Sequence, residues 1–106
     1  MVTVVRRTAE FRFFHPFANC VYLAGDFNAW QADELPMTLG PDGYWRGTLL
    51  LPAGVFRFRY RADGQWFTDY AADGLVPNLY GEFNSLLHVP ESKAAKSRGR
   101  KTQAQA

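Results

Sequence analysis

The sequence predicts an all-β fold, a β-sandwich, because short apolar runs recur at close spacing and none keeps the 3.6-residue period of a helix. Between residues 8 and 89 these runs are rich in aromatic and β-branched residues, and Gly, Pro, Asn and Asp separate them. Roughly six or seven short strands in such a stretch are typical of a sandwich. The chain of 106 residues is long enough for one domain and too short for a (β/α)₈ barrel, which needs roughly 250 residues.

Each expected strand is an apolar run bounded by residues that favour turns. The six strands cover residues 9–14, 20–24, 44–51, 55–62, 65–68 and 85–89. The turns between them contain Pro16, the GDFN segment at 25–28, Pro41-Asp42-Gly43, Pro52-Ala53-Gly54 and Asp63-Gly64.

Alternating side chains assign one face of each strand to the core, since successive residues of a strand point to opposite faces. The residues expected to converge in the core are Phe11, Phe13, Val21, Leu23, Trp45, Phe58 and Tyr60. Arg57, Arg59 and Arg61 alternate with the core residues of strand 55–62, so we expect them on its outer face. Cys20, the only cysteine, opens strand 20–24, where we expect a buried and unreactive thiol.

The Asp63-Gly64 turn fixes which residues of the next two strands face each other, because Asp-Gly between apolar runs predicts a two-residue hairpin turn. The expected pairs are Ala62 with Gln65, Arg61 with Trp66, Tyr60 with Phe67, and Arg59 with Thr68. Directly paired residues project from the same face of a sheet. Phe67 therefore joins the core, and Trp66 lies on the outer face beside arginines.

A tryptophan on an outer sheet face beside arginines suits few ligands. A sugar ring can stack on the indole while its hydroxyls accept hydrogen bonds from a guanidinium. Stacked nucleobases suit the same groups, and the ring can also simply cover the sheet with Arg61 over it. Trp30 is a second tryptophan that is hard to assign to a core, because it follows the GDFN segment among polar residues.

The net charge of +2 divides between two unlike segments. Residues 1–89 contain seven Arg, no Lys and nine Asp or Glu, a net charge of −2, which does not favour nucleic-acid binding. Residues 90–106 contain five Lys or Arg and one Glu, a net charge of +4, and no aromatic residue. We interpret residues 8–89 as the folded domain and residues 90–106 as a basic, disordered tail that ligand binding does not need.

No apolar stretch is long enough for a secretory signal or a membrane helix, so we expect a cytoplasmic protein without membrane partners. No metal site and no cofactor motif is legible. The acidic residues fall in turns and loops, where turn chemistry explains them, rather than in a pair suited to glycoside hydrolysis. An enzyme is therefore disfavoured.

Three segments taken together resemble one known family. They are VYLAGDFNAW at 21–30, LPAGVFRFRYRADGQWFTD at 51–69 and FNSLLHV at 83–89. They look like the early-set glycogen-binding domain, carbohydrate-binding module family 48, which includes domains of AMP-activated protein kinase β subunits, branching enzymes and isoamylases. The resemblance covers roughly residues 8–89. It implies an immunoglobulin-like (early-set) β-sandwich that binds α-1,4-linked glucose chains on an outer face.

The resemblance also implies roles for individual residues. Trp30 and Trp66 correspond to two tryptophans on which sugar rings stack. Arg59, seven positions before Trp66, corresponds to a basic residue that donates hydrogen bonds to sugar hydroxyls, and we expect its donors to face water in the free protein. Asn84 corresponds to the Asn that opens the last strand.

Two positions depart from the family pattern, which has a Leu that inserts into the glucan coil and a Thr two positions later. Matched backward from Asn84, these positions hold Tyr80 and Glu82. A tyrosine can stack on a sugar and hydrogen-bond to it, so Tyr80 is counted among the expected sugar-binding residues. Glu82 places an acid where the pattern has a hydroxyl, and Leu79 takes the place of Tyr80 if the loop is shifted by one residue.

We therefore interpret the chain as a non-catalytic module for an α-1,4-glucan such as glycogen, starch or maltodextrin. The alternative is an early-set docking or regulatory module that binds a protein, for example an enzyme of glycogen metabolism, and no glucan. The exposure of Trp30 and Trp66 on one surface would favour the glucan, and burial of both would favour docking.

Overall fold

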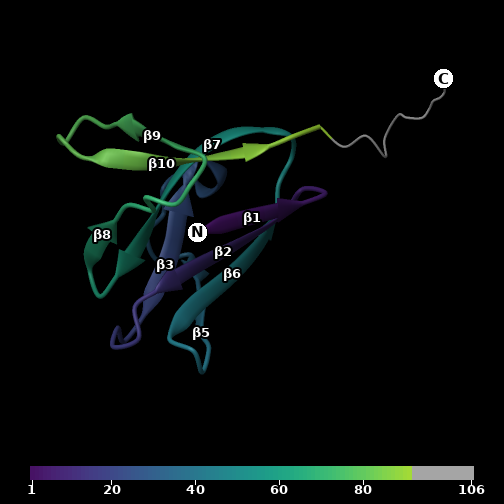
Figure 1. The fold of residues 1–106 in the computed structure, drawn as a ribbon. Coiled ribbons are helices and arrows are strands. Elements are labelled where there is room, and N and C mark those ends of the chain that lie inside the picture. Colours follow the sequence, from purple (N-terminus) through teal and green to yellow (C-terminus); the bar gives the residue numbers. More distant parts are fainter. Residues whose placement is uncertain (92–106) are drawn as a thin grey trace, which may run out of the picture.

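The computed structural model describes residues 1–91, which form a sandwich of two antiparallel sheets (Figure 1). The smaller sheet has the order β1-β2-β6-β5, with bounds Val2–Val5, Thr8–Phe14, Tyr44–Leu50 and Thr38–Leu39. The larger sheet has the order β4-β3-β7-β10-β9, with bounds Leu35–Pro36, Val21–Gly25, Gly54–Ala62, Phe83–Val89 and Gly74–Pro77. A further strand, β8 (Gln65–Phe67), pairs with β7.

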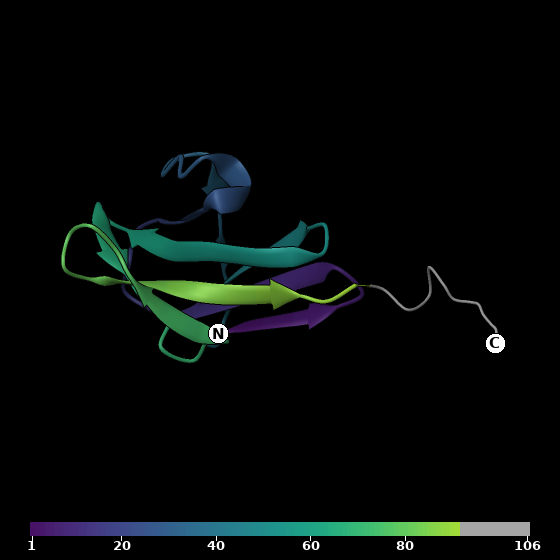
Figure 2. The ribbon, with the colours of Figure 1, turned by 90° about the horizontal axis from the view of Figure 1, so that it is seen from above.

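This architecture confirms the expected all-β sandwich. Figure 2 shows β7 and β10 side by side in one layer and β1 and β2 in the other. The one helical element among residues 1–91 is a short 3₁₀ turn, η1 (Asp26–Asn28), and none is long and apolar enough to cross a membrane. Of the expected tail, residues 92–106 lie outside the described residues.

All six expected strands are present, with ends that differ by no more than two residues. Four further strands, β1, β4, β5 and β9, were not expected. β4 and β5 have two residues each, so no local apolar run can reveal them. β9 begins at Gly74 and ends at Pro77, residues that signal a turn when they are read from the sequence alone.

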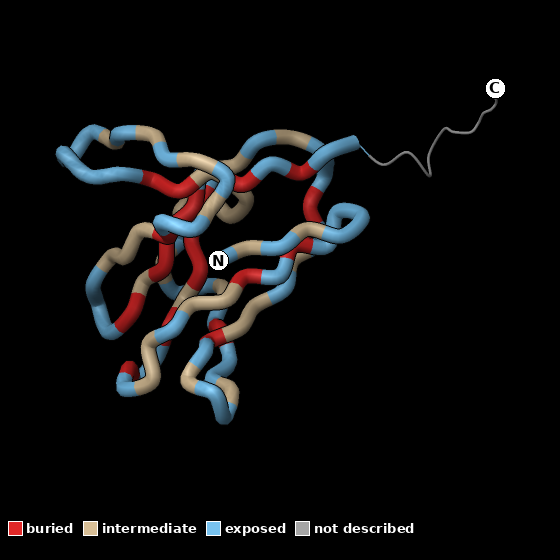
Figure 3. The backbone as a smooth tube through the Cα atoms, viewed as in Figure 1, coloured by how far each residue is buried: buried red, intermediate tan, exposed pale blue. Residues whose placement is uncertain are grey.

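The core residues expected from alternation lie between the two sheets. Phe11, Phe58 and Tyr60 are fully buried, Val21, Leu23 and Trp45 nearly so, and Phe13 is half-buried and packed against them. The ring of Phe58 meets that of Phe11 edge to face, with 5.1 Å between centroids, and Phe13 stacks on Tyr60 at 4.5 Å. Figure 3 shows the buried segments gathered where the sheets face each other.

The Asp63-Gly64 turn pairs β7 and β8 in the expected register. Ala62 faces Gln65, Arg61 faces Trp66 and Tyr60 faces Phe67. Asp63 and Gly64 have φ angles of 49° and 82°, as a type I′ turn requires. The fourth expected pair, Arg59 with Thr68, does not form, because β8 ends at Phe67 and the Thr68 hydroxyl donates instead to the backbone oxygen of Phe83 at 2.7 Å.

The expectation of a buried cysteine was wrong, because Cys20 is exposed. β3 begins one residue later, at Val21, so Cys20 belongs to the loop before the strand. Its backbone N–H and that of Asn19 donate to the Asp63 carboxylate, at 3.0 and 2.9 Å. Asp63 thus stabilises the turn it belongs to and also anchors the chain where it enters β3.

A buried polar network holds the segment that follows β8. The Asp69 carboxylate accepts hydrogen bonds from the Tyr60 hydroxyl at 2.8 Å and the backbone N–H of Ala71 at 2.9 Å, and the Met1 amino group is its ion-pair partner. The Asp69 N–H donates to the Ser85 hydroxyl at 2.7 Å. Burial, with the neighbouring Asp69 charge, raises the pKa of Tyr60 far above its usual value. Tyr60 therefore stays neutral and serves as a donor.

Replacing a fully buried ring tests this packing. Phe58→Ala should lower the free energy of unfolding by about 3–5 kcal/mol, because it leaves a cavity between the sheets. Phe17→Ala is the matched control: its ring is 94% exposed, so the change should stay below about 0.5 kcal/mol. Urea unfolding followed by tryptophan fluorescence measures both, and similar small losses would contradict the core assignment.

Candidate functional site

A groove of about 810 Å³ lies on the outer face of the larger sheet. All five residues expected to bind sugar line it: Trp30, Arg59, Trp66, Tyr80 and Asn84. They come from four parts of the chain, namely the segment after η1, β7 with β8, the loop at 78–82 and the start of β10. Arg57, which alternation placed on the outer face, lines it too, and two further lining residues, Pro77 and Asn78, were not singled out from the sequence.

A tight turn presents Trp30. Ala29 and Trp30 both have left-handed backbone conformations, with φ of 56° and 59°, which non-glycine residues adopt only when their surroundings impose it. The Trp30 N–H donates to the Gly25 oxygen at 2.9 Å, and the Asn28 side-chain oxygen accepts from the Gly25 N–H at 3.1 Å. Gly25 is required here, because a Cβ would lie 2.4 Å from the Arg57 backbone oxygen.

The Asp26 carboxylate connects this turn to β7. It accepts hydrogen bonds from the Trp30 indole N–H at 2.9 Å and from the backbone N–H and Nε of Arg57 at 2.8 and 3.1 Å. Burial by itself would raise the pKa of Asp26, but the hydrogen bonds from Arg57 and Trp30 outweigh it and hold the pKa below its usual value. The carboxylate is therefore ionised near neutral pH and fixes the indole of Trp30.

The two tryptophans form one aromatic surface. Their ring centroids lie 6.1 Å apart, with 63° between the planes, and both residues are half-buried. The guanidinium carbons of Arg61 and Arg59 lie 4.9 and 5.8 Å from the centroid of the Trp66 ring. Arg61 thus covers part of the sheet with Trp66, as the simplest interpretation of the sequence expects. Trp66 also lines the groove next to Trp30, which that interpretation alone does not explain.

The Arg59 side chain is more deeply buried than we expected. We expected its donors to face water, but the residue is only 6% exposed and its Nη2 forms an ion pair with Glu82 at 2.9 Å. Trp66 lies over it on one side, and the loop that carries Glu82 closes the other. Its buried Nε has no hydrogen-bond partner among residues 1–91. Arg59 is thus a pre-positioned donor held by a carboxylate.

The loop at 78–82 between β9 and β10 is held by Asn78. Its side-chain oxygen accepts from the N–H groups of Tyr80 and Glu82, at 2.9 and 3.1 Å, and its amide donates to the Asn84 side chain at 3.3 Å. Leu79 and Tyr80, in this loop, are 98% and 86% exposed. Figure 3 shows the tip of the β9–β10 hairpin in the colour of exposed residues. An Asn whose side chain caps a tight loop is a common turn pattern. Asn78, between Pro77 and Gly81, fits this pattern, so its role in the loop could have been predicted from the sequence.

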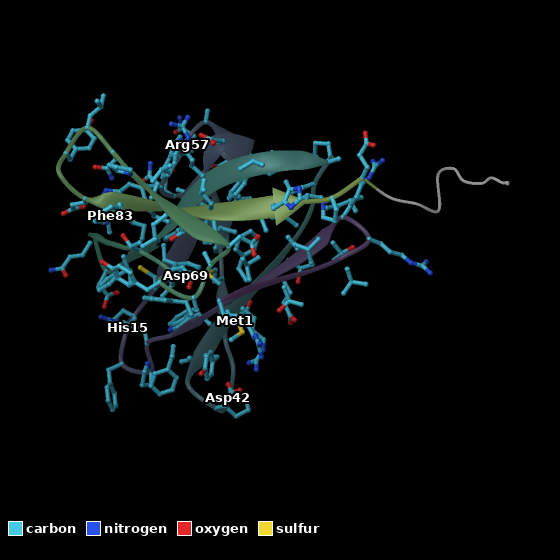
Figure 4. All side chains as sticks on the ribbon, turned by 45° about the horizontal axis from the view of Figure 1, so that its top comes forward. Met1, His15, Asp42, Arg57, Asp69 and Phe83 are labelled. Atoms are coloured by element: carbon cyan, nitrogen blue, oxygen red, sulfur yellow. The ribbon has the colours of Figure 1, made fainter. Side chains whose placement is uncertain are left out.

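The chemistry of this groove is that of binding. It offers aromatic faces, guanidinium donors and amide groups. The one carboxylate among its lining residues, Glu82, forms an ion pair with Arg59, and the neighbouring Asp26 forms one with Arg57. Within residues 1–91 there is no group of three or more His, Cys, Asp or Glu side chains that could hold a metal ion. In Figure 4, Arg57 and Phe83 lie toward the β9–β10 hairpin, and Asp42 lies at the other end of the molecule.

Comparison with known proteins connects these features to one family of domains. Residues 8–95 match the family described as the glycogen recognition site of AMP-activated protein kinase. The beta-1 subunit of 5'-AMP-activated protein kinase from Rattus norvegicus is 32% identical over 72 residues, 68% of this chain and 25% of the subunit. The 1,4-alpha-glucan branching enzyme of Mycobacterium tuberculosis is 33% identical over 89 residues, 82% of this chain and 11% of the enzyme. The chain spans a quarter or less of the length of these relatives.

The lowered pKa of Asp26 gives a pH dependence with a definite sign. A carboxyl with a depressed folded pKa contributes stability above its unfolded value, 3.8 here, and loses that contribution as the pH falls through the folded value. Near-ultraviolet circular dichroism of the tryptophans should therefore change below about pH 3.8, as Trp30 loses its acceptor. In Asp26→Asn this part of the change should be absent. Identical titrations of the two proteins would contradict the role given to Asp26.

Proposed function

Because this chain belongs to the family of the glycogen recognition site of AMP-activated protein kinase, we propose that it binds an α-1,4-linked glucan in the groove between Trp30 and the loop at 78–82. The domain is a carbohydrate-binding module and not itself a catalytic one. The proposal concerns which residues bind, which glucan they bind and what the binding achieves.

The observation that carries the proposal is the pair of neighbouring indoles in one groove. Sugar rings have flat apolar faces that pack on Trp30 and Trp66, while hydroxyls at their rims need donors and acceptors. Arg59 supplies donors, and Asn84 supplies an amide that can do both. Tyr80, exposed at the loop tip, adds a ring and a hydroxyl on the far wall. Such a set suits a neutral polymer of glucose better than a nucleic acid, because the Glu82 carboxylate lines the same groove.

Glycogen is the glucan we propose, since the family is described as a glycogen recognition site and the Mycobacterium tuberculosis relative is named a glucan branching enzyme. The module would bring an attached or associated glycogen-metabolism enzyme to the polymer in the cytoplasm. Residues 8–89 would suffice for this, and residues 90–106 would not contribute. A docking module for a protein partner is the second candidate, and it requires that no glucan binds.

Removing either indole should weaken sugar binding without unfolding the protein. By analogy with base stacking at about 1–3 kcal/mol per ring, Trp30→Ala and Trp66→Ala should each weaken maltoheptaose binding about 5- to 150-fold. Calorimetric titration measures the loss, and thermal melts should shift little, since neither ring belongs to the core. Trp45→Phe, in the core, is the control that should leave affinity unchanged. If the wild type binds no α-glucan, the docking module becomes the better explanation.

Glu82 should limit affinity, because its carboxylate occupies the donors of Arg59. Glu82→Gln keeps the shape of the side chain and removes the charge, so maltoheptaose binding should tighten about 3- to 10-fold, the size of a partly released charged hydrogen bond. Arg59→Ala should act in the opposite direction and also lower the melting temperature, since Arg59 is buried. Both affinities come from the same titrations. Weaker binding by Glu82→Gln would show that Glu82 contacts the sugar favourably.

A further inference from the structure

A second groove, of about 440 Å³, adjoins the first. The two grooves share Arg59, Trp66 and Glu82, so the Arg59–Glu82 ion pair stands at their junction. Beyond the junction the second groove is lined by Phe67, Thr68, Tyr70, Gly81 and Phe83. None of these five residues lines the first groove.

We propose that this second groove is an additional sugar subsite, filled by the same glucan where it passes the Arg59–Glu82 pair, and that Tyr70 is the ring on which that part of the chain packs. The proposal rests on the proposed function, because the occupant is inferred from the continuity of the two grooves. It extends the site beyond the two tryptophans and makes affinity depend on the length of the glucan.

Tyr70 is exposed, yet its position is well fixed. Its ring is 75% exposed, while Asp69, directly before it, is buried and bonded to Ser85 and Tyr60. The N–H of Ala71, directly after it, donates to the Asp69 carboxylate at 2.9 Å. An exposed aromatic side chain between two anchored residues loses little backbone freedom on binding, which favours a role as a binding surface.

The opposite wall is fixed as well. Phe83 is 44% exposed, and its backbone oxygen accepts the hydrogen bond from Thr68 at 2.7 Å, which joins the segment after β8 to the start of β10. Figure 4 shows Phe83 on the side of the β9–β10 hairpin, with Asp69 between it and Met1. The groove therefore has an aromatic side chain on each of two joined segments.

Arg59 provides a second, independent indication of a ligand at the junction. It is a charged side chain buried to more than nine-tenths, it lines both grooves, and its Nε lacks a hydrogen-bond partner among residues 1–91. Because this guanidinium lines both grooves, its donors can serve a sugar hydroxyl at the junction. The exposed carboxylate of Glu82 at the same place disfavours an anion, whereas a neutral sugar hydroxyl can accept a hydrogen bond from Arg59.

Oligosaccharides of two different lengths distinguish binding in the first groove from binding in both grooves. Calorimetric titrations would use maltotetraose, short enough for the first groove, and a linear maltooligosaccharide of ten or more glucose units. Tyr70→Ala should weaken binding of the long chain about 5- to 20-fold, as expected for loss of one stacked ring, and change maltotetraose binding less than about twofold. Tyr70→Phe, which keeps the ring, should bind the long chain nearly as well as the wild type. Phe17→Ala, also an exposed aromatic but in neither groove, should change neither affinity.

The outcomes distinguish this inference from the proposed function. Equal affinity of Tyr70→Ala and the wild type for the long chain would overturn the subsite and leave the first groove intact. An equal loss for both ligands with an unchanged melting temperature would also overturn it, because Tyr70 would then act in the first groove. If the wild type binds neither oligosaccharide, the proposed function itself fails.

Discussion

The register of β7 against its neighbours is the constraint on which the rest of the molecule depends. Side chains alternate along a strand, so a slip of one residue would send the arginines of β7 and Trp66 into the core and Phe58 and Tyr60 to the surface. The Asp63-Gly64 turn prevents this slip in two ways. Its left-handed backbone fixes the pairing of β7 with β8, and the Asp63 carboxylate accepts hydrogen bonds from the backbone just before β3. One short turn thus decides which aromatic residues fill the core and which remain available to a ligand.

The site is made from loops, and single polar side chains give these loops the fixed positions that strands have by pairing. Asp26 ties the Trp30 turn to β7, and Asn78 ties the hairpin tip to its own base and to Asn84. Each of these two side chains accepts hydrogen bonds from several N–H groups. Backbone N–H groups in loops need such acceptors, because they have no partner strand. The groove therefore exists before any ligand arrives, so little ordering accompanies binding.

The sequence was sufficient for the fold class, six of the ten strands, the core faces and the outward position of Trp66, because period-2 alternation and an Asp-Gly turn are local signals. Of the four strands that were missed, β4 and β5 contain only two residues each and β9 is bounded by Gly and Pro. The same local reasoning put Trp30 and Trp66 on the surface but could not measure their separation, which depends on how η1 packs against β7. The same reasoning placed the start of β3 one residue too early, so Cys20 was wrongly expected to be buried. It also placed the Arg59 side chain in water, because the Arg59–Glu82 ion pair joins positions that only the folded hairpin brings together.

The two edges of the larger sheet have a consequence for how copies of this protein behave when crowded. β4 and β9 are short, and each ends in a proline, Pro36 or Pro77, which cannot donate a hydrogen bond to an added strand. A module that gathers on a polymer reaches high local concentrations, at which open sheet edges would pair between molecules and seed insoluble aggregates. Blunted edges leave neighbouring copies separate, so a densely coated polymer particle can remain dispersed.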